Sequence, residues 1–166
     1  MKKIHLILTF IVFIIICFSL TSCGAVKIKD IISEESTITL SDDAELVLTD
    51  NSGSLTEKKK VETISYTIAN NSNSDYYFFG TGDDAILLVL NENIWYRTSY
   101  GGDCTAEGYT LAPGEQMNME FHLGTHGTSY TLPAGTYRLV KNVEITDSYG
   151  ARGEYLYCYF EFTVAS

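Results

Sequence analysis

The chain has 166 residues, of which 21 are acidic and 11 are basic, so its formal net charge at pH 7 is −10. An acidic chain of this kind argues against binding to nucleic acid and against electrostatic docking on anionic lipid, since both need clustered positive charge. The length fits one domain with a core of its own.

The N-terminus has the pattern of a bacterial lipoprotein signal. Met1-Lys2-Lys3 precedes an apolar stretch over residues 4–20, which ends in Leu20-Thr21-Ser22-Cys23. A basic start, an apolar run and small residues before the cleavage site are typical of secretory signals. The alternative, an uncleaved membrane-spanning helix, is less favoured because the run is short for a bilayer and no basic stop-transfer cluster follows. We predict cleavage after Ser22 and a diacylglycerol on the sulfur of Cys23.

Two acyl chains on Cys23 make a stable anchor where one would be marginal. Removal of residues 1–22 leaves 144 residues with nine basic and 21 acidic side chains, a net charge of −12. We therefore expect a monomer that is lipid-anchored at the extracytoplasmic side of the cell membrane. Residues 23–36 are predicted to be the lipidated cysteine and a tether, because their polarity is mixed and without period, and residues 37–166 the folded domain.

From residue 37 onward, apolar and polar side chains alternate with the period of two that half-buried strands show. Turn clusters rich in Gly, Asn, Asp and Ser separate the runs. Six to nine short strands with no competing amphipathic helix predict an all-β antiparallel sandwich of about 7–9 strands. A short helical turn within residues 50–60 stays open. The runs cover residues 37–40, 46–48, 61–68, 76–79, 85–90, 95–99, 116–123, 135–145 and 154–164.

In the run over residues 135–145, Tyr137 follows Gly135 at the position of a tyrosine corner, whose hydroxyl bonds back to the main chain. The phase that places Tyr137 and Leu139 inward also places Lys141 inward. A buried lysine is costly, so we expect either a bulge that corrects the phase or a strand that has already left the core.

The last strand has the clearest phase. One face carries Leu156, Cys158, Phe160, Phe162 and Val164, which we predict to be buried. The other face carries Tyr155, Tyr157 and Tyr159, and tyrosine suits protein or glycan recognition because it offers a large contact area with few rotors. These three residues are the candidate binding face. The alternative is cross-strand packing on the sheet surface.

Cleavage removes Cys17 and lipidation occupies Cys23, so two cysteines with free thiols remain in the mature chain. An even pair in an exported protein suggests a disulfide, and Cys104 could reach Cys158 if the loop around residues 101–104 folds over the sandwich. The alternative for Cys158 is a buried, inert thiol.

Catalytic and metal-binding patterns are weak. His122 and His126 are four apart on a strand and its loop, where that spacing does not bring both rings to one face. Asp42-Asp43 and Asp83-Asp84 lack the spacing of a calcium loop, and no serine lies in a nucleophile elbow. We predict no catalytic residue and no metal site, and the sequence implies no cofactor.

Several segments between Val61 and Val164 resemble a bacterial immunoglobulin-like domain family found in secreted and lipid-anchored proteins. They are Asn70-Asn71-Ser72, Trp95-Tyr96, Leu111-Ala112-Pro113-Gly114-Glu115, the run from Leu132 to Lys141 and Phe160-Glu161-Phe162-Thr163-Val164. The resemblance implies a Greek-key β-sandwich without catalytic residues, and such a scaffold does not settle function.

We therefore expect a non-catalytic binding or structural module that meets a protein or a cell-envelope glycan. A protease inhibitor that presents the loop from Tyr100 to Tyr109 is one alternative. An envelope hydrolase is another.

Overall fold

The computed structural model describes residues 26–41, 45–80, 84–101, 107–124, 127–146 and 152–166. One short helix and thirteen strands are found in these ranges. In chain order they are α2 (Ile28–Ile31), β1 (Ile32–Glu35), β2 (Leu46–Asp50), β3 (Leu55–Thr56), β4 (Lys60–Val61), β5 (Thr63–Asn70), β6 (Asp75–Phe79), β7 (Ile86–Asn91), β8 (Ile94–Thr98), β9 (Gly108–Leu111), β10 (Gln116–His122), β11 (Tyr130–Thr131), β12 (Gly135–Thr146) and β13 (Arg152–Ala165). Across the described ranges, no helix is long and apolar enough to cross a membrane.

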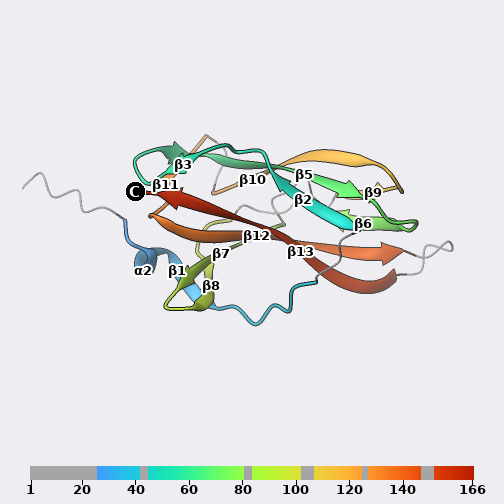
Figure 1. Ribbon diagram of the computed structural model, residues 1–166, viewed down its shortest axis with the longest axis horizontal. Coiled ribbons are helices and arrows are strands. Elements are labelled where there is room, and N and C mark those ends of the chain that lie inside the picture. Colours follow the sequence, from blue (N-terminus) through green and yellow to red (C-terminus); the bar gives the residue numbers. More distant parts are fainter. Residues whose placement is uncertain (1–25, 42–44, 81–83, 102–106, 125–126, 147–151) are drawn as a thin grey trace, which may run out of the picture.

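The strands form two main layers (Figure 1). An eight-stranded sheet has the order β1-β8-β7-β12-β13-β3, with β6 beside β12 and β9 beside β6. The three-stranded sheet β10-β5-β2 packs on it, and β11 and β4 form a small pair. The predicted all-β sandwich is confirmed. Eight of the thirteen described strands correspond to predicted runs, in keeping with the predicted 7–9 strands. The other five, β1, β3, β4, β9 and β11, were not predicted.

The core lies between the two layers. On β5 the alternation places Ile64, Tyr66 and Ile68 inward, all fully buried. The Tyr66 ring meets that of Phe160 on β13, with 5.9 Å between the ring centroids. Contacts of this kind hold the sheets face to face, because each sheet buries its apolar face against the other.

The predicted phase of β13 is confirmed. Cys158, Phe160, Phe162 and Val164 are buried, while Leu156, near the start of the strand, is half-buried. Residues 135–144 of β12 pair with β13 residue by residue without interruption, and the register shifts only between Glu144 and Thr146. The long regular pairing keeps one parity, and therefore one face, in the core.

The tyrosine corner is also confirmed. The Tyr137 hydroxyl donates a hydrogen bond to the carbonyl oxygen of Pro133 at 2.7 Å. The side chain is fully buried, and its ring stacks on Phe162 with 5.5 Å between centroids. Burial raises the pKa of Tyr137 above its ordinary value, and the neighbouring Tyr100 adds to this. The hydroxyl thus pins the turn before β12 to the start of the strand.

Tyr137→Phe should lower the free energy of unfolding at pH 7 by about 1 kcal/mol or somewhat more, because the Pro133 carbonyl loses a buried partner. The parent should also lose stability as the pH rises above 10.0, the ordinary pKa, because the unfolded chain releases this proton before the folded chain does. The phenylalanine variant should lose less over that range. Urea midpoints at pH 7 and above pH 10 measure both effects, and equal midpoints at pH 7 would make Tyr137 ordinary packing.

The predicted tether over residues 23–36 is wrong for most of its length. Ile28–Ile31 is α2, and Ile32–Glu35 is β1, which pairs with β8. Ile31 is buried in the core. A Cβ on Gly135 would lie 3.1 Å from the Ile28 Cδ1, so this glycine leaves the space into which Ile28 packs. Short segments of mixed polarity such as these show no period in the sequence, and β1 becomes a strand only by pairing with β8.

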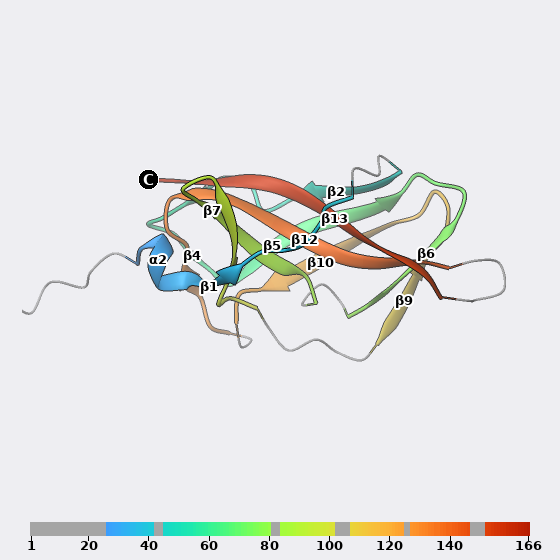
Figure 2. The ribbon, with the colours of Figure 1, turned by 90° about the horizontal axis from the view of Figure 1, so that it is seen from below.

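Residues 37–40 were predicted to be a strand, but they belong to an irregular segment, residues 36–41, that crosses the outer face of the large sheet (Figures 1 and 2). The amide of Ser36 donates to the Trp95 carbonyl on β8, and the amide of Ser41 donates to the Tyr157 carbonyl on β13. Ile38 and Leu40 in this segment are half-buried. The helical turn left open for residues 50–60 is not there, since this stretch holds β3 and the start of β4. The two-residue strands are too short to show a period in sequence.

Candidate functional site

A gap interrupts one edge of β12. The strand pairs with β7 through residues 137–140 and with β6 through residues 144–146. In the described part of the chain no strand pairs with residues 141–143 on this edge. β6 leads away from β12 at this point and pairs with β9 through residues 76–79. The change of partner opens the sheet, and side chains fill the opening.

Lys141 lies at this gap and is fully buried. Its Nζ donates to the Phe79 carbonyl at 2.9 Å, forms an ion pair with the carboxylate of Asp84, and lies 4.9 Å from the centroid of the Phe78 ring. The two predicted alternatives, a bulge at Lys141 and departure of the strand from the core, are therefore both wrong. The strand stays in register because an acceptor and an opposite charge satisfy the ammonium group.

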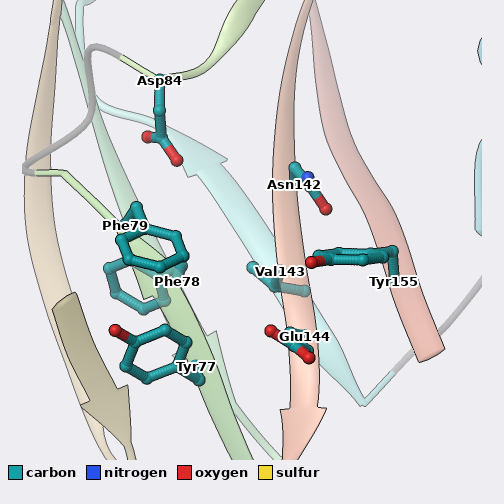
Figure 3. Close-up of a pocket in the computed structure, with 8 residues that line it drawn as sticks. All are labelled: Tyr77, Phe78, Phe79, Asp84, Asn142, Val143, Glu144 and Tyr155. Carbon is teal, nitrogen blue, oxygen red and sulfur yellow. The ribbon is translucent and has the colours of Figure 1, made fainter. Parts of the chain in front are cut away.

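A small pocket lies at the same gap, and Asp84, the ion-pair partner of Lys141, is one of its lining residues (Figure 3). Aromatic rings of Tyr77 and Phe79 on β6 and of Tyr155 on β13 lie around it, together with Phe78, Asp84, Asn142, Val143 and Glu144. Its free volume is about 30 Å³, roughly the share of one water molecule in the liquid. The rings of Tyr77 and Phe79 meet edge to face with 5.1 Å between centroids. The pocket is thus a small aromatic recess with a polar end.

Glu144 supplies the polar end. It faces Tyr77 across β6 and Tyr155 across β13, and these neighbours leave its side chain only 2% exposed. Neither carboxylate oxygen has a hydrogen-bond partner among the described residues, and the same holds for the buried Oδ1 of Asn142. A buried carboxylate without donors is costly. Three acceptor atoms here therefore lack donors.

Gly108 on β9 positions the Tyr77 ring. A Cβ at this glycine would lie 1.9 Å from the Tyr77 hydroxyl oxygen and 2.6 Å from its Cζ. Only glycine lets the phenol lie across β9 in this way, because any larger residue would push the ring aside. The geometry of the pocket thus depends on a residue that does not line it.

A family model described as bacterial Ig-like domain matches residues 34–155. The chain belongs to this family. Among solved structures, it is similar to the ASH / PapD-like domain of human CEP192 (PapD-like domain 7), at 12% identity over 79% of this chain and 91% of that chain, with a TM-score of 0.37. A comparison with curated protein sequences gave no match.

The predicted binding face of the Ig-like domain is not a uniform stripe of tyrosines. Tyr155 is 51% exposed, whereas Tyr157 and Tyr159 are half-buried. Tyr157 bonds through its main chain to Ser41 of the crossing segment. The guanidinium of Arg138 lies 4.8 Å from the centroid of the Tyr159 ring. Only Tyr155 of the three lines the pocket.

Arg138 ties the outer face of the Ig-like domain together. Its guanidinium also lies 4.0 Å from the centroid of the Trp95 ring on β8, and its Nε donates to the Glu161 carboxylate at 3.0 Å. Cation–π contacts and a charged hydrogen bond of this kind order the surface. Tyr159 therefore packs across the strands, which is the alternative that the sequence left open.

Several predicted residues lie outside the described ranges. These are Cys23 of the predicted lipidation site, Cys104 of the proposed disulfide, His126, Asp42, Asp43, Asp83 and residues 102–106 of the loop over residues 100–109. Cys158 is buried, 3% exposed, and the pairing with Cys104 stays a prediction. His122 is half-buried on β10. Within the part of the chain that the structure describes, no three His, Cys, Asp or Glu side chains gather where they could hold a metal ion.

Sequence patterns did not single out Glu144 or Asn142 as functional residues. By parity both point away from the core, and the ordinary reading of such residues is a solvated surface. Glu144 is buried because Tyr77 and Tyr155 pair with it on the two flanking strands, whereas Asn142, which pairs with Tyr157, is half-buried. In the sequence, Glu144 lies between two β-branched residues, and aromatic runs occur elsewhere in the chain. This pattern indicates a pocket only weakly, because the pairing register decides which aromatic residues lie beside Glu144.

Proposed function

We propose that this protein is a lipid-anchored module of the bacterial cell envelope, whose Ig-like domain binds a protein or an envelope glycan without catalysing a reaction. The anchor would be a diacylglycerol on Cys23, which becomes the first residue of the mature protein when the signal is cleaved after Ser22. The observation that carries the binding role is the aromatic pocket with its unpaired buried carboxylate. Apolar walls with a few polar groups are typical of ligand sites, and this recess has room for one small group of a ligand.

The placement of the pocket supports this role. α2, near the start of the described chain, lies at one end of the sandwich, while β6, β9 and the far ends of β12 and β13 lie at the other (Figures 1 and 2). A chain anchored through its N-terminal segment would therefore hold the pocket at the end away from the membrane. That end would be free to meet a partner.

The charge of the mature chain supports a partner other than nucleic acid. A net charge of −12 repels phosphate groups, both in nucleic acid and in anionic lipid headgroups. It favours a partner that carries positive charge or none. The anchor, and not surface charge, would account for membrane attachment.

Cys23→Ala tests the anchor. The variant should remain as uncleaved precursor or leave the detergent-soluble membrane fraction, because the sulfur that accepts the diacylglycerol is gone. Fractionation of cells, with immunoblotting for size, measures both outcomes. Cys17→Ala is the matched control, since Cys17 lies within the predicted signal and should not matter. Processing and fractionation of Cys23→Ala like the parent would contradict the lipoprotein role.

A further inference from the structure

The unpaired acceptors in the pocket point to one kind of ligand group. We propose that the pocket binds a primary ammonium carried on an alkyl chain, as in a lysine side chain of a partner polypeptide or a free alkylamine. The inference names the ligand class for the proposed binding role. It rests on that role only for the identity of the partner, because binding to the pocket can be tested on the purified protein.

The first argument is the match of donors to acceptors. Glu144 presents two carboxylate oxygens and Asn142 presents its Oδ1, and among the described residues none of the three atoms receives a hydrogen bond. An alkylammonium has three N–H donors and one positive charge. Its donors match these acceptors in number, and its charge would neutralise the carboxylate, so binding would remove the cost of that buried charge.

The second argument is the charge balance around the gap. The nearby ammonium of Lys141 is already engaged by Asp84 and by the Phe79 carbonyl. Among the described residues, two carboxylates line the pocket, those of Asp84 and Glu144, and Lys141 at the same gap is paired with the first of them. A second positive charge is the complement that this arrangement favours.

The third argument comes from the walls and the size. The faces and edges of Tyr77, Phe79 and Tyr155 suit an organic cation, because aromatic rings attract cations and pack against alkyl groups. A space of about 30 Å³ admits one ammonium group. A quaternary ammonium is larger and has no N–H donor. Calcium takes six to eight oxygen ligands, more than these side chains offer.

The pocket is reachable from solvent. Tyr155 is 51% and Phe79 is 38% exposed, and both line the recess. The exposed aromatic surface at the mouth would contact the alkyl chain behind the ammonium group, while the head reaches Glu144. A ligand with a long, flexible stem therefore fits better than a bare ammonium ion.

A titration of the full chain in detergent micelles tests the proposal. Two-dimensional amide NMR would follow residues 77, 79, 142, 144 and 155 during addition of butylammonium. We expect saturable shifts confined to these residues, with a dissociation constant in the millimolar range that single-group ligands reach. A short blocked peptide with one lysine should bind at the same residues if a polypeptide is the source. Binding of butylammonium alone would support the pocket and assign it to free amines.

Matched variants separate the ligand site from general effects. Glu144→Gln keeps the shape and removes the charge, so butylammonium should bind about tenfold more weakly or worse, while the thermal midpoint without ligand stays equal or rises. Gly108→Ala should displace the Tyr77 ring and weaken binding severalfold. Glu120→Gln changes an exposed carboxylate on β10 and should bind like the parent.

Three results would overturn the proposal. One is the absence of saturable shifts with butylammonium, as expected if a cation of the chain itself neutralises Glu144. Another is equal binding by the parent and Glu144→Gln. The third is a preference for tetramethylammonium or calcium over butylammonium. None of these depends on the lipid anchor, so failure of the pocket and failure of the Cys23→Ala test are distinguishable.

Discussion

Asp84→Ala should lower the free energy of unfolding by about 3–5 kcal/mol. The reason is the fully buried ammonium of Lys141, which would keep the Phe79 carbonyl at 2.9 Å but lose its ion-pair partner. A buried charge without a counter-charge is far costlier than the pair itself is stabilising. Urea unfolding followed by circular dichroism gives the difference.

The partner variant and the double variant make this test specific. Lys141→Met removes the buried charge and fills the space with a flexible apolar chain, so it should cost less than Asp84→Ala, because the Asp84 carboxylate keeps some access to water. The double variant, Asp84→Ala with Lys141→Met, has no buried ammonium without a counter-charge. It should therefore regain much of the stability that Asp84→Ala loses. An Asp84→Ala protein that unfolds at the parent midpoint would show that Lys141 finds another acceptor.

Phe160→Ala should also cost about 3–5 kcal/mol, because it removes a large ring from the centre of the sandwich and leaves a cavity. The ring lies between Tyr66 of the facing sheet and Phe162 of its own strand, with centroids at 5.9 and 5.8 Å. Thermal and urea unfolding measure the loss. The effect should appear as a lower midpoint with an unchanged slope.

Leu156→Ala is the matched control on the same face of β13. Leu156 is half-buried, so its truncation removes less burial and leaves a shallower gap, and it should cost clearly less than the Phe160 change. Equal losses at the two positions would mean that the core extends along β13 as far as Leu156. A loss below about 1 kcal/mol at Phe160 would mean that the cavity collapses.

Local pattern was enough to predict the fold class, the main strands and the core side of β13. The alternation of Leu156, Cys158, Phe160, Phe162 and Val164 has one solution when a sheet buries a single face. The tyrosine corner was equally readable, because Gly135 and Tyr137 stand at a fixed offset from the turn that the hydroxyl reaches. Such features depend on neighbours within a few residues.

Contacts between distant strands decided the rest. The fate of Lys141 depended on Asp84 and the Phe79 carbonyl, which lie 57 and 62 positions away in the chain. β1 forms a strand because it pairs with β8, and Tyr159 is half-buried where the Arg138 guanidinium packs against its ring. Glu144 became a buried acceptor only because β6 and β13 place Tyr77 and Tyr155 on either side of it. Periodicity tells which face a side chain takes, whereas the register and the partner strands determine what covers that face.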